Sequence, residues 1–514
     1  MSMKTRESEH GASRRDFLKI ATCGGVLTAG IMMAGCSESE AQGVSQQDTT
    51  FDQETDVLVL GGGSGGCFAA NYAMRQGASV VIVEADSRIG GTTLLSGGFY
   101  HTWDITPENA AEMLSSADPA KREFFINKWG EVCDWVINES GLPAAPLDLD
   151  YPLYGAHLKG FSTSGTEKAI GRQTFLEDLV DGATVILDTY LIELVGSDDG
   201  SILGAVIRDK NGVIQTIGAK ATIIATGSYQ ANKGMITQYL GRWADCSVCR
   251  ATPYNKGVGI ALALEKGARM SKGTGHFYGH LNPWPPLTPQ TEEEYGDPDF
   301  DVYTPIMGAV QKFSVEGLAL NTNGLRFTDE GPENYVGDNY LANDLTQEPD
   351  GHCFIIIDSA QDHKADLSII SDAGGVVLEA NTIDELADQM KSYKVHAQNV
   401  KKTVSEYQAA AVADTTAELP IAKSPMPTGY LTKMDTPPFY AVQVAAGISG
   451  FYGGLETTNE GKVLDYSDTP IRGLFAVPMA SGGVFYKEYG GGLALCATFG
   501  AAAGEAAGAE AITS

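Results

Sequence analysis

The sequence predicts an α/β protein whose folded part begins with a Rossmann-like nucleotide-binding unit. Residues 56–60 form a short apolar run of β-type residues, and the glycine-rich residues 61–66 follow at once. A helical pattern then covers residues 67–76, and a second apolar run over 78–83 ends at Glu84. A strand, a GxGxxG turn, a helix and an acid at the end of the next strand are together the fingerprint of a dinucleotide site.

The glycines of this turn have separate roles. We expect Gly61 to permit the turn, Gly63 to let the backbone approach a pyrophosphate, and Gly66 to let the helix pack on the strand. Free N–H groups at the helix N-terminus would bind the phosphates, and Glu84 stands where an acid binds ribose hydroxyls. A tight turn without a ligand is the alternative, which the four elements together disfavour. The predicted contacts of this turn are Gly61, Gly63, Ser64, Gly65, Gly66, Glu84 and Ala85.

The glycines that follow favour a flavin over a nicotinamide. A second glycine pair at 90–91 and the sequence Ser-Gly-Gly at 96–98 lie within a short distance of Glu84. A wide tricyclic ring and a ribityl chain need close backbone approach along their length, which glycine allows. The predicted contacts of this loop are Gly91, Thr92, Thr93, Ser96, Gly97 and Gly98.

A further strand pattern completes the nucleotide-binding unit. Residues 219–225 form a β-type run that ends in Thr226 and Gly227, after a hairpin-like stretch over 204–214. Two tyrosines, Tyr486 and Tyr489, stand just before a run of three glycines near the C-terminus.

With these motifs the chain resembles the FAD-dependent fumarate reductase / 3-ketosteroid dehydrogenase superfamily over about residues 52 to 510. The shared motifs lie at 61–66, 90–98, 225–227 and 490–492. The resemblance implies FAD as the cofactor and a FAD-binding domain of the glutathione-reductase type. The additional FAD contacts that it implies are Ala225, Thr226, Gly227, Gly491, Gly492 and Leu493.

The resemblance also implies an inserted α+β cap domain that closes over the substrate. The expected organisation is a signal peptide over 1–36, a linker over 37–51, FAD-binding parts over 52–272 and 445–514, and a cap over 273–444. Within the cap, residues 324–330 resemble a GxRFxNE motif of the family. Thr382 with Glu385 three residues later predicts a capped helix with a structural role.

Composition and charge exclude several classes of function. The chain of 514 residues has a formal charge of −30, which argues against a nucleic-acid partner. No CxxCH motif occurs, so we expect no c-type haem within the chain. The lone CxxC at 246–249 has no second pair or nearby histidine and does not predict a zinc site. We therefore expect electrons to pass to or from a separate cytochrome or quinone-linked protein.

The N-terminal residues predict export. Residues 13–19, SRRDFLK, resemble a twin-arginine signal, and the apolar run behind them is too short to cross a membrane. The sequence before Cys36 resembles a lipoprotein cleavage box, so Cys36 is a candidate for lipid attachment. The alternative is a plain signal peptide cut near Ala34. We expect a periplasmic or cell-surface protein.

Three cationic features of the fumarate branch are missing here. No arginine occurs between Arg326 and Arg472, Gly450 stands where that branch has a histidine, and no arginine precedes the terminal glycines. A dicarboxylate needs fixed guanidinium groups. Fumarate is therefore a poor candidate for the substrate.

The ketosteroid branch instead suggests phenols as catalytic groups. Tyr486 and Gly490 match the spacing of the tyrosine and glycine N–H that hold the substrate's carbonyl oxygen in that branch. Tyr335 lies close to its proton-handling tyrosine, and Tyr489 is a second phenol that could face the flavin. Tyr340 and Tyr452 are weaker candidates, because most of the 21 tyrosines must serve packing. His276, His280 and Lys487 are interpreted as non-catalytic.

These observations predict an exported flavin-dependent oxidoreductase. We expect it to reduce the C=C bond of an α,β-unsaturated carbonyl or carboxylate, including steroid-like enones, by hydride transfer and protonation from a tyrosine. Alternatives are a 3-ketosteroid dehydrogenase that works in the oxidative direction, a reductase of the fumarate or urocanate type, and a flavin electron carrier or a binding lipoprotein without an organic substrate.

Overall fold

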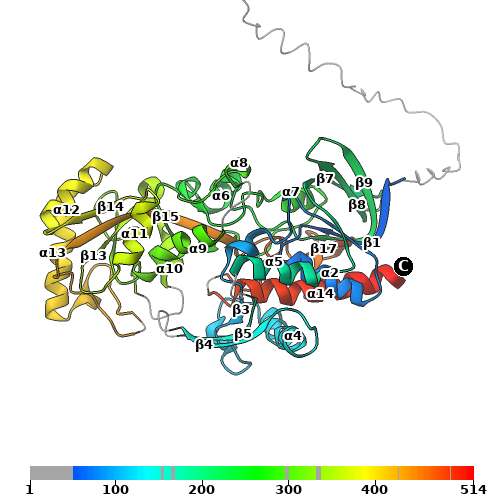
Figure 1. The fold of residues 1–514 in the computed structure, drawn as a ribbon, viewed down its shortest axis with the longest axis horizontal. Coiled ribbons are helices and arrows are strands. Elements are labelled where there is room, and N and C mark those ends of the chain that lie inside the picture. Colours follow the sequence, from blue (N-terminus) through cyan, green and yellow to red (C-terminus); the bar gives the residue numbers. More distant parts are fainter. Residues whose placement is uncertain are drawn as a thin grey trace, which may run out of the picture. The chain divides into compact units, whose positions relative to one another are not determined.

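Three β-sheets organise the chain within residues 50–151, 156–163, 168–295, 300–331, 337–426, 428–486 and 488–513, which the computed structural model describes (Figure 1). Phe51–Ser514 forms one compact unit, distinct from Met1–Thr50. The expected signal peptide and Cys36 lie outside the described residues. In the ranges that are described, no helix is both long enough and apolar enough to span a bilayer.

The first sheet confirms the predicted nucleotide-binding fold. Its centre is β1 (Gln53–Leu60), which pairs in parallel with β2 (Val80–Val83) and β9 (Ile214–Ile224). β6 (Thr184–Ile186) extends the parallel order beyond β2, and β17 (Pro470–Ala476) extends it beyond β9. The last four residues of β1 are all buried, as expected for a parallel strand that is covered on both faces.

An antiparallel hairpin is attached to this sheet. β8 (Ile202–Asp209) pairs with β9 and with β7 (Thr189–Gly196), and β16 (Lys462–Leu464) pairs with β17. The turn between β8 and β9 confirms the hairpin expected over 204–214.

Two helices with small residues at their interface cover one face of the first sheet. α2 (Ser64–Arg75) follows the glycine turn, and α14 (Gly492–Thr513) packs beside it. A Cβ at Gly504 would lie 2.1 Å from the carbonyl oxygen of Ala69, so only glycine allows this approach. α4 (Pro119–Asn138) also packs against α14.

The second sheet is built around the long strand β15 (Phe439–Phe451). The first half of β15 pairs with β13 (His352–Ile357) and β14 (Val377–Ala380). The second half pairs with β11 (Phe277–Pro283) and β10 (Val248–Cys249). Figure 1 shows β15 running from the cap helices toward the nucleotide-binding sheet. The expected domain boundary after residue 444 falls inside this continuous strand.

Helices pack on the outer half of the second sheet, where β12 (Leu318–Asn321) pairs with β13. These helices are α11 (Lys364–Asp372), α12 (Ile383–Met390) and α13 (Ala397–Ala413). The oxygen Oγ1 of Thr382 accepts a hydrogen bond from the Glu385 backbone N–H at 3.2 Å, so the predicted cap of α12 is present.

The motif at 324–330 holds the cap together internally. Arg326 donates from Nε to Oε1 of Glu330 at 2.9 Å and from Nη2 to Oε2 at 2.6 Å. Both side chains are buried. The pair is therefore a bidentate structural ion pair.

A third, smaller sheet contains β3 (Phe99–Thr102), β5 (Ala156–Ser162) and β4 (Ala145–Tyr151) in that order. The remaining helices are α3 (Ala110–Met113), α5 (Lys168–Leu179), α6 (Lys233–Leu240), α7 (Val258–Glu265), α8 (Glu292–Tyr295), α9 (Phe300–Ala309) and α10 (Gly337–Leu345). Short 3-10 helices are η1 (Gly91–Leu95), η3 (Ala244–Cys246), η4 (Val310–Lys312), η5 (Pro349–Gly351), η6 (Lys391–Tyr393) and η7 (Thr416–Glu418).

Candidate active site

A large cavity opens where the parallel strands of the first sheet end. Its volume is about 1170 Å³, and its wall includes Leu60 at the end of β1, Val83 at the end of β2 and Ala225 just after β9. Ligands of open α/β sheets bind outside the carboxyl ends of the strands. The volume exceeds the roughly 300–1000 Å³ of a typical ligand pocket. The cavity can therefore hold a dinucleotide together with a second, smaller molecule.

Most of the predicted FAD contacts line this cavity. Those in its wall are Gly61, Gly63, Ser64, Gly65, Glu84, Ala85, Gly91, Thr92, Thr93, Ser96, Gly97, Ala225, Thr226, Gly227, Gly492 and Leu493. Gly66, Gly98 and Gly491 are not among the lining residues. At Gly66 a Cβ would lie 2.0 Å from the carbonyl oxygen of Gly61, which is the helix-packing role expected for this glycine.

The glycine turn leaves space for a phosphate-bearing ligand. A Cβ at Gly63 would meet just one protein atom within 4 Å, the carbonyl oxygen of Gly90 at 3.9 Å, so a side chain would enter the cavity. Gly63 is the N-cap of α2 and offers no side chain to the N–H groups of the first helical turn. Such N–H groups bind anions, and the helix dipole favours negative charge at this end.

Unpartnered polar atoms in the wall also indicate a bound molecule. Oγ1 of Thr226, Oε1 of Gln230 and Nδ1 of His101 are buried and have no hydrogen-bond partner among the described residues. All three side chains line the cavity. Buried polar groups are normally paired, so a ligand with several polar groups, such as FAD, fits this wall.

Glu84 is held at the cavity wall by two backbone N–H groups. Oε2 accepts from Gly62 at 2.6 Å and Oε1 accepts from Asp86 at 2.8 Å. Burial raises the pKa of Glu84 to about 6, and these hydrogen bonds oppose the shift. The carboxyl group is thereby fixed beside the glycine turn, as required for binding a ribose.

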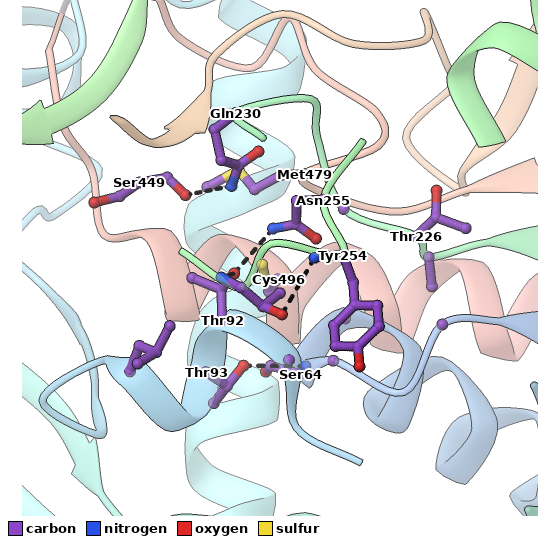
Figure 2. A pocket seen from close by; sticks show the side chains of 18 of the residues that line it. Ser64, Thr92, Thr93, Thr226, Gln230, Tyr254, Asn255, Ser449, Met479 and Cys496 are labelled. Atoms are coloured by element: carbon purple, nitrogen blue, oxygen red, sulfur yellow. Dashed lines mark hydrogen bonds between the residues drawn. The ribbon is translucent and has the colours of Figure 1, made fainter. Parts of the chain in front are cut away.

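The segment that contains the predicted flavin contacts Thr92 and Thr93 is hydrogen-bonded to the segment after β10. Oγ1 of Thr92 accepts from Nδ2 of Asn255 at 2.9 Å and from the backbone N–H of Thr252 at 3.3 Å (Figure 2). Oγ1 of Thr93 accepts from the backbone N–H of Ser64 at 3.2 Å. These bonds connect the segments of Ser64, Thr92 and Asn255, which all line the cavity.

A group of aromatic side chains lines another part of the cavity. We call this group the aromatic wall; its members are His101, Trp103, Tyr278, His280 and Tyr489. The rings of Tyr278 and Tyr489 are parallel, with an interplanar angle of 11° and centroids 3.7 Å apart. Trp103 meets the ring of Tyr489 edge-on at 6.3 Å and that of His101 at 5.0 Å.

The polar ends of this wall form a hydrogen-bonded chain. Nε2 of His280 lies 2.8 Å from Oη of Tyr278, and Tyr278 forms a side-chain hydrogen bond to Tyr489 that lowers the pKa of Tyr489. Oη of Tyr489 accepts the backbone N–H of Gly492 at 2.6 Å. When Nε2 of His280 donates to Tyr278 and Tyr278 donates to Tyr489, Tyr489 accepts from both neighbours and its own O–H proton is available to a molecule in the cavity.

Burial determines the charge states in the aromatic wall. It raises the pKa of Tyr489, and the bonds from Gly492 and Tyr278 and the charge of Arg250 oppose that shift. It lowers the pKa of His101 to about 4. Near neutral pH, Tyr489 is therefore a protonated phenol and His101 a neutral imidazole.

Arg250 is a cation in the cavity wall. Its Nη1 donates to Oγ of Ser449 at 2.8 Å, and its backbone N–H donates to the carbonyl oxygen of Ile448 at 3.0 Å. Nε is buried and has no hydrogen-bond partner in the described part of the chain. Gln230 donates from Nε2 to the carbonyl oxygen of Ser449 at 2.7 Å, which fixes this strand segment (Figure 2).

The predicted catalytic residues occupy different places. Tyr489 lines the cavity, whereas Tyr486 and Gly490 are not among its lining residues. The Tyr486 backbone N–H donates to Oγ of Ser116 at 3.1 Å, and its ring faces His276. Tyr335 lies outside the described residues, as does Lys487.

The weaker candidate Tyr452 is buried, and its Oη accepts a hydrogen bond from Nδ2 of Asn339 at 3.4 Å. It is not among the residues that line the cavity. Tyr340 packs against the cluster of Trp103 and Leu158.

Sequence reasoning missed Arg250 and Tyr278 and assigned no role to His280. Tyr278 and His280 are two residues apart in β11, and this spacing along a strand is the one signal that could have linked them. Arg250 directly follows the CxxC at 246–249, where the cysteines and not the arginine suggested chemistry.

Comparison with known proteins gives consistent matches. The family described as FAD binding domain matches residues 56–498. The probable fumarate reductase Ifc3 of Shewanella frigidimarina is 27% identical over 90% of this chain and 76% of its own length. The vinyl phenol reductase of Lactiplantibacillus plantarum is 25% identical over 85% of this chain and 91% of its own. The structure of 3-ketosteroid delta1-dehydrogenase from Sterolibacterium denitrificans superposes with a TM-score of 0.69 at 20% identity, covering 89% of this chain and all of that one.

Proposed function

The chain belongs to the FAD binding domain family, and from this premise we propose that it reduces the C=C bond of a small α,β-unsaturated carbonyl or carboxylate compound. It is an FAD-dependent oxidoreductase. Relatives named for fumarate and for vinyl phenol support the proposal, because both compounds contain a C=C bond. When bound, FAD would supply the hydride for this reaction.

The observation that carries the proposal is the position of the Tyr489 phenol in the cavity wall. Two donors, Gly492 N–H and the Tyr278 hydroxyl, bond its oxygen and leave its own proton for a molecule in the cavity. Addition of one hydride and one proton across a C=C bond gives the saturated product. We assign the proton to Tyr489.

The same hydrogen-bonded chain can restore the phenol after each turnover. When Tyr489 has given its proton away, the Tyr278 hydroxyl can donate to the phenolate oxygen. His280 lies 2.8 Å from Tyr278 and can donate in turn when its imidazole carries a proton on both nitrogens, which leaves a neutral ring behind. Burial raises the pKa of Tyr489, which favours the protonated form that a proton donor needs.

Tyr489 is one of the four catalytic residues expected from the sequence, and the proposal assigns the proton transfer to it. Tyr486 and Gly490 stay predictions for binding the substrate's carbonyl oxygen, although they lie outside the cavity wall. Tyr335 stays a prediction as well.

An anaerobic experiment tests the proposed reaction. The purified protein's flavin is reduced with dithionite and mixed with cinnamate, urocanate, fumarate or a 3-ketosteroid, and flavin absorbance reports reoxidation. We expect rapid reoxidation by at least one of the unsaturated compounds and none by its saturated analogue. If no unsaturated compound reoxidises the flavin, while a quinone or cytochrome does, the protein is an electron carrier and the proposal is wrong.

We further propose that the protein is exported and receives its electrons from a separate cytochrome or quinone-linked protein. The twin-arginine motif supports export, and the absence of a CxxCH motif from the sequence supports a separate partner. Cell fractionation of the wild-type protein and of Cys36→Ala tests whether a lipid attached to Cys36 anchors the exported protein to the membrane. Release of the Cys36→Ala protein from the membrane fraction supports it, and identical fractionation of the two contradicts it.

A further inference from the structure

We propose that Arg250 is the anion-binding residue of the cavity, and that the substrates are planar aromatic carboxylic acids with a C=C bond, such as aryl-substituted acrylic acids. This inference rests on the proposed function and adds the substrate class. It narrows the expected carbonyl and carboxylate compounds to carboxylates, and it assigns their binding to a cation where the sequence suggested a phenol and an N–H group.

The charge of Arg250 is not neutralised by a carboxylate within the described residues. Its side chain bonds the neutral hydroxyl of Ser449, and it takes part in no ion pair there. The lysines in the cavity wall differ, since Lys210 pairs with Asp188 at 2.8 Å and Lys256 pairs with Glu292. A partly buried cation without an anion is costly, which favours an anionic ligand beside it.

The guanidinium group retains donors for a carboxylate. Nη1 is engaged by Ser449, whereas Nε is buried and has no partner within the described ranges. A guanidinium binds a carboxylate through two parallel N–H groups, and such charge-assisted pairs are the strong ones. The bond to Ser449 and the backbone bond to Ile448 fix the arginine before a ligand arrives.

Arg250 lies near the proposed proton donor. Its positive charge is one of the interactions that lower the pKa of Tyr489 against the effect of burial. Arg250 follows β10 directly, and β10 pairs with the half of β15 that also pairs with β11, the strand of Tyr278 and His280. The cation and the aromatic wall therefore belong to one region of the cavity.

The aromatic wall selects the rest of the molecule. The indole of Trp103 and the phenol ring of Tyr489 present an apolar, aromatic surface in the cavity. Aromatic side chains favour offset or edge-on contact with another planar ring. A ligand with a carboxylate at one end and a planar ring at the other matches both features, and the C=C bond of an aryl acrylate lies between them.

The anionic oxygen could instead come from FAD, through its pyrophosphate or its reduced ring. The glycine turn and the N-terminus of α2 already provide a site for the pyrophosphate. The experiment separates the two sources, because it measures binding of a carboxylate and properties of the flavin independently.

The test is a titration of the FAD-loaded, oxidised protein with 3-phenylpropanoate, a saturated acid that cannot be reduced, and with its neutral amide. Flavin absorbance changes or calorimetry give Kd for each. We expect the wild-type protein to prefer the acid, and Arg250→Gln to weaken acid binding about 10- to 100-fold with the amide changed less than about 3-fold. Arg250→Lys should fall between the two proteins.

The matched control is Arg472→Gln, because Arg472 pairs with Asp199 away from the cavity and should leave both Kd values unchanged. FAD content and Tm show whether each variant is folded. If Arg250→Gln does not bind FAD, the titration is done with Arg250→Lys in its place. Equal loss of acid and amide binding, or none, overturns the proposal. The proposal is also overturned if Arg250→Gln lowers the FAD affinity or the flavin midpoint potential but leaves acid binding unchanged. That result would show that Arg250 binds an anionic group of FAD and not the substrate.

The outcome is separable from that of the proposed function. If the acid binds in an Arg250-dependent way but no unsaturated compound reoxidises the reduced flavin, the anion site stands and the proposed reaction fails. If aryl acrylates are reduced at the same rate by Arg250→Gln and wild type, the reaction stands and the role of Arg250 is wrong.

Discussion

The ring of Tyr489 lies parallel to the ring of Tyr278 with their centroids 3.7 Å apart, and their hydroxyl groups are joined in one hydrogen-bonded chain. The two residues come from β11 and from the loop before α14. Their contact therefore connects the second sheet to the helix that covers the nucleotide-binding sheet. It also places two phenols in the hydrogen-bonded chain that starts at His280.

Replacing Tyr489 with Phe removes the proton donor and keeps the ring stack. We expect reoxidation of the reduced flavin by a substrate to slow by about 10²- to 10⁴-fold, the range for loss of a general acid. Stopped-flow absorbance measures this rate. Tyr466→Phe is the control, because Tyr466 is 78% exposed and not in the cavity wall. Unchanged turnover in Tyr489→Phe with FAD bound would contradict the role assigned to it.

Replacing Tyr278 with Phe interrupts the chain between His280 and Tyr489. In the proposed relay, Tyr278 acts through Tyr489 and does not itself protonate the substrate. If Tyr278 had only a structural role, its loss would alter substrate binding but not proton transfer. We expect turnover to fall by roughly 10-fold and the solvent deuterium isotope effect on turnover to rise, because proton resupply becomes slow. Tyr393→Phe, whose ring meets Phe354 in the cap, is the control. An isotope effect equal to that of the wild type would show that Tyr278 does not pass protons to Tyr489.

The sequence identified the nucleotide half of this site because its signals are local. The strand, turn and helix around Gly61 follow one another in the chain. β1 and α2 overlap the predicted ranges 56–60 and 67–76, and each begins three residues earlier than predicted. The aromatic wall has no such signal, since His101, Tyr278 and Tyr489 meet only through the tertiary fold. The choice between Tyr486 and Tyr489 also depends on the path of a non-periodic loop, which residue types alone do not determine.

Glu84 should make the stability of the apoprotein depend on pH. Its pKa is raised to about 6 in the folded protein by burial, from the ordinary value of 4.5. The folded state thus holds the proton more tightly than the unfolded state, so this group's stabilising contribution is present below about pH 4.5 and is lost as pH rises through about 6. A shift of this size corresponds to about 2 kcal/mol.

Urea unfolding of the apoprotein between pH 4.5 and 7.5 measures this effect, with Glu84→Gln for comparison. The difference between the two proteins isolates Glu84 from the other titrating groups. We expect the wild type to lose stability relative to Glu84→Gln over this range, and Glu84→Gln to bind FAD about 10-fold more weakly. Parallel pH curves for the two proteins would show that Glu84 does not titrate as described.

Gly63→Ala tests the nucleotide site without a change in backbone conformation. The added methyl group would meet almost no protein atom, so we expect a folded protein with a free energy of unfolding within about 1 kcal/mol of the wild type. The methyl would instead occupy space beside the N-terminus of α2, where a pyrophosphate needs close backbone approach. FAD affinity should therefore fall at least about 10-fold, measured by fluorescence titration of the apoprotein.

Gly130→Ala is the matched control, since Gly130 is exposed in α4 and a Cβ there would have open space around it. In this position the methyl group should stabilise the helix by roughly 0.5–1 kcal/mol. Equal FAD affinity in Gly63→Ala and Gly130→Ala would mean that the cofactor's phosphates bind elsewhere in the cavity.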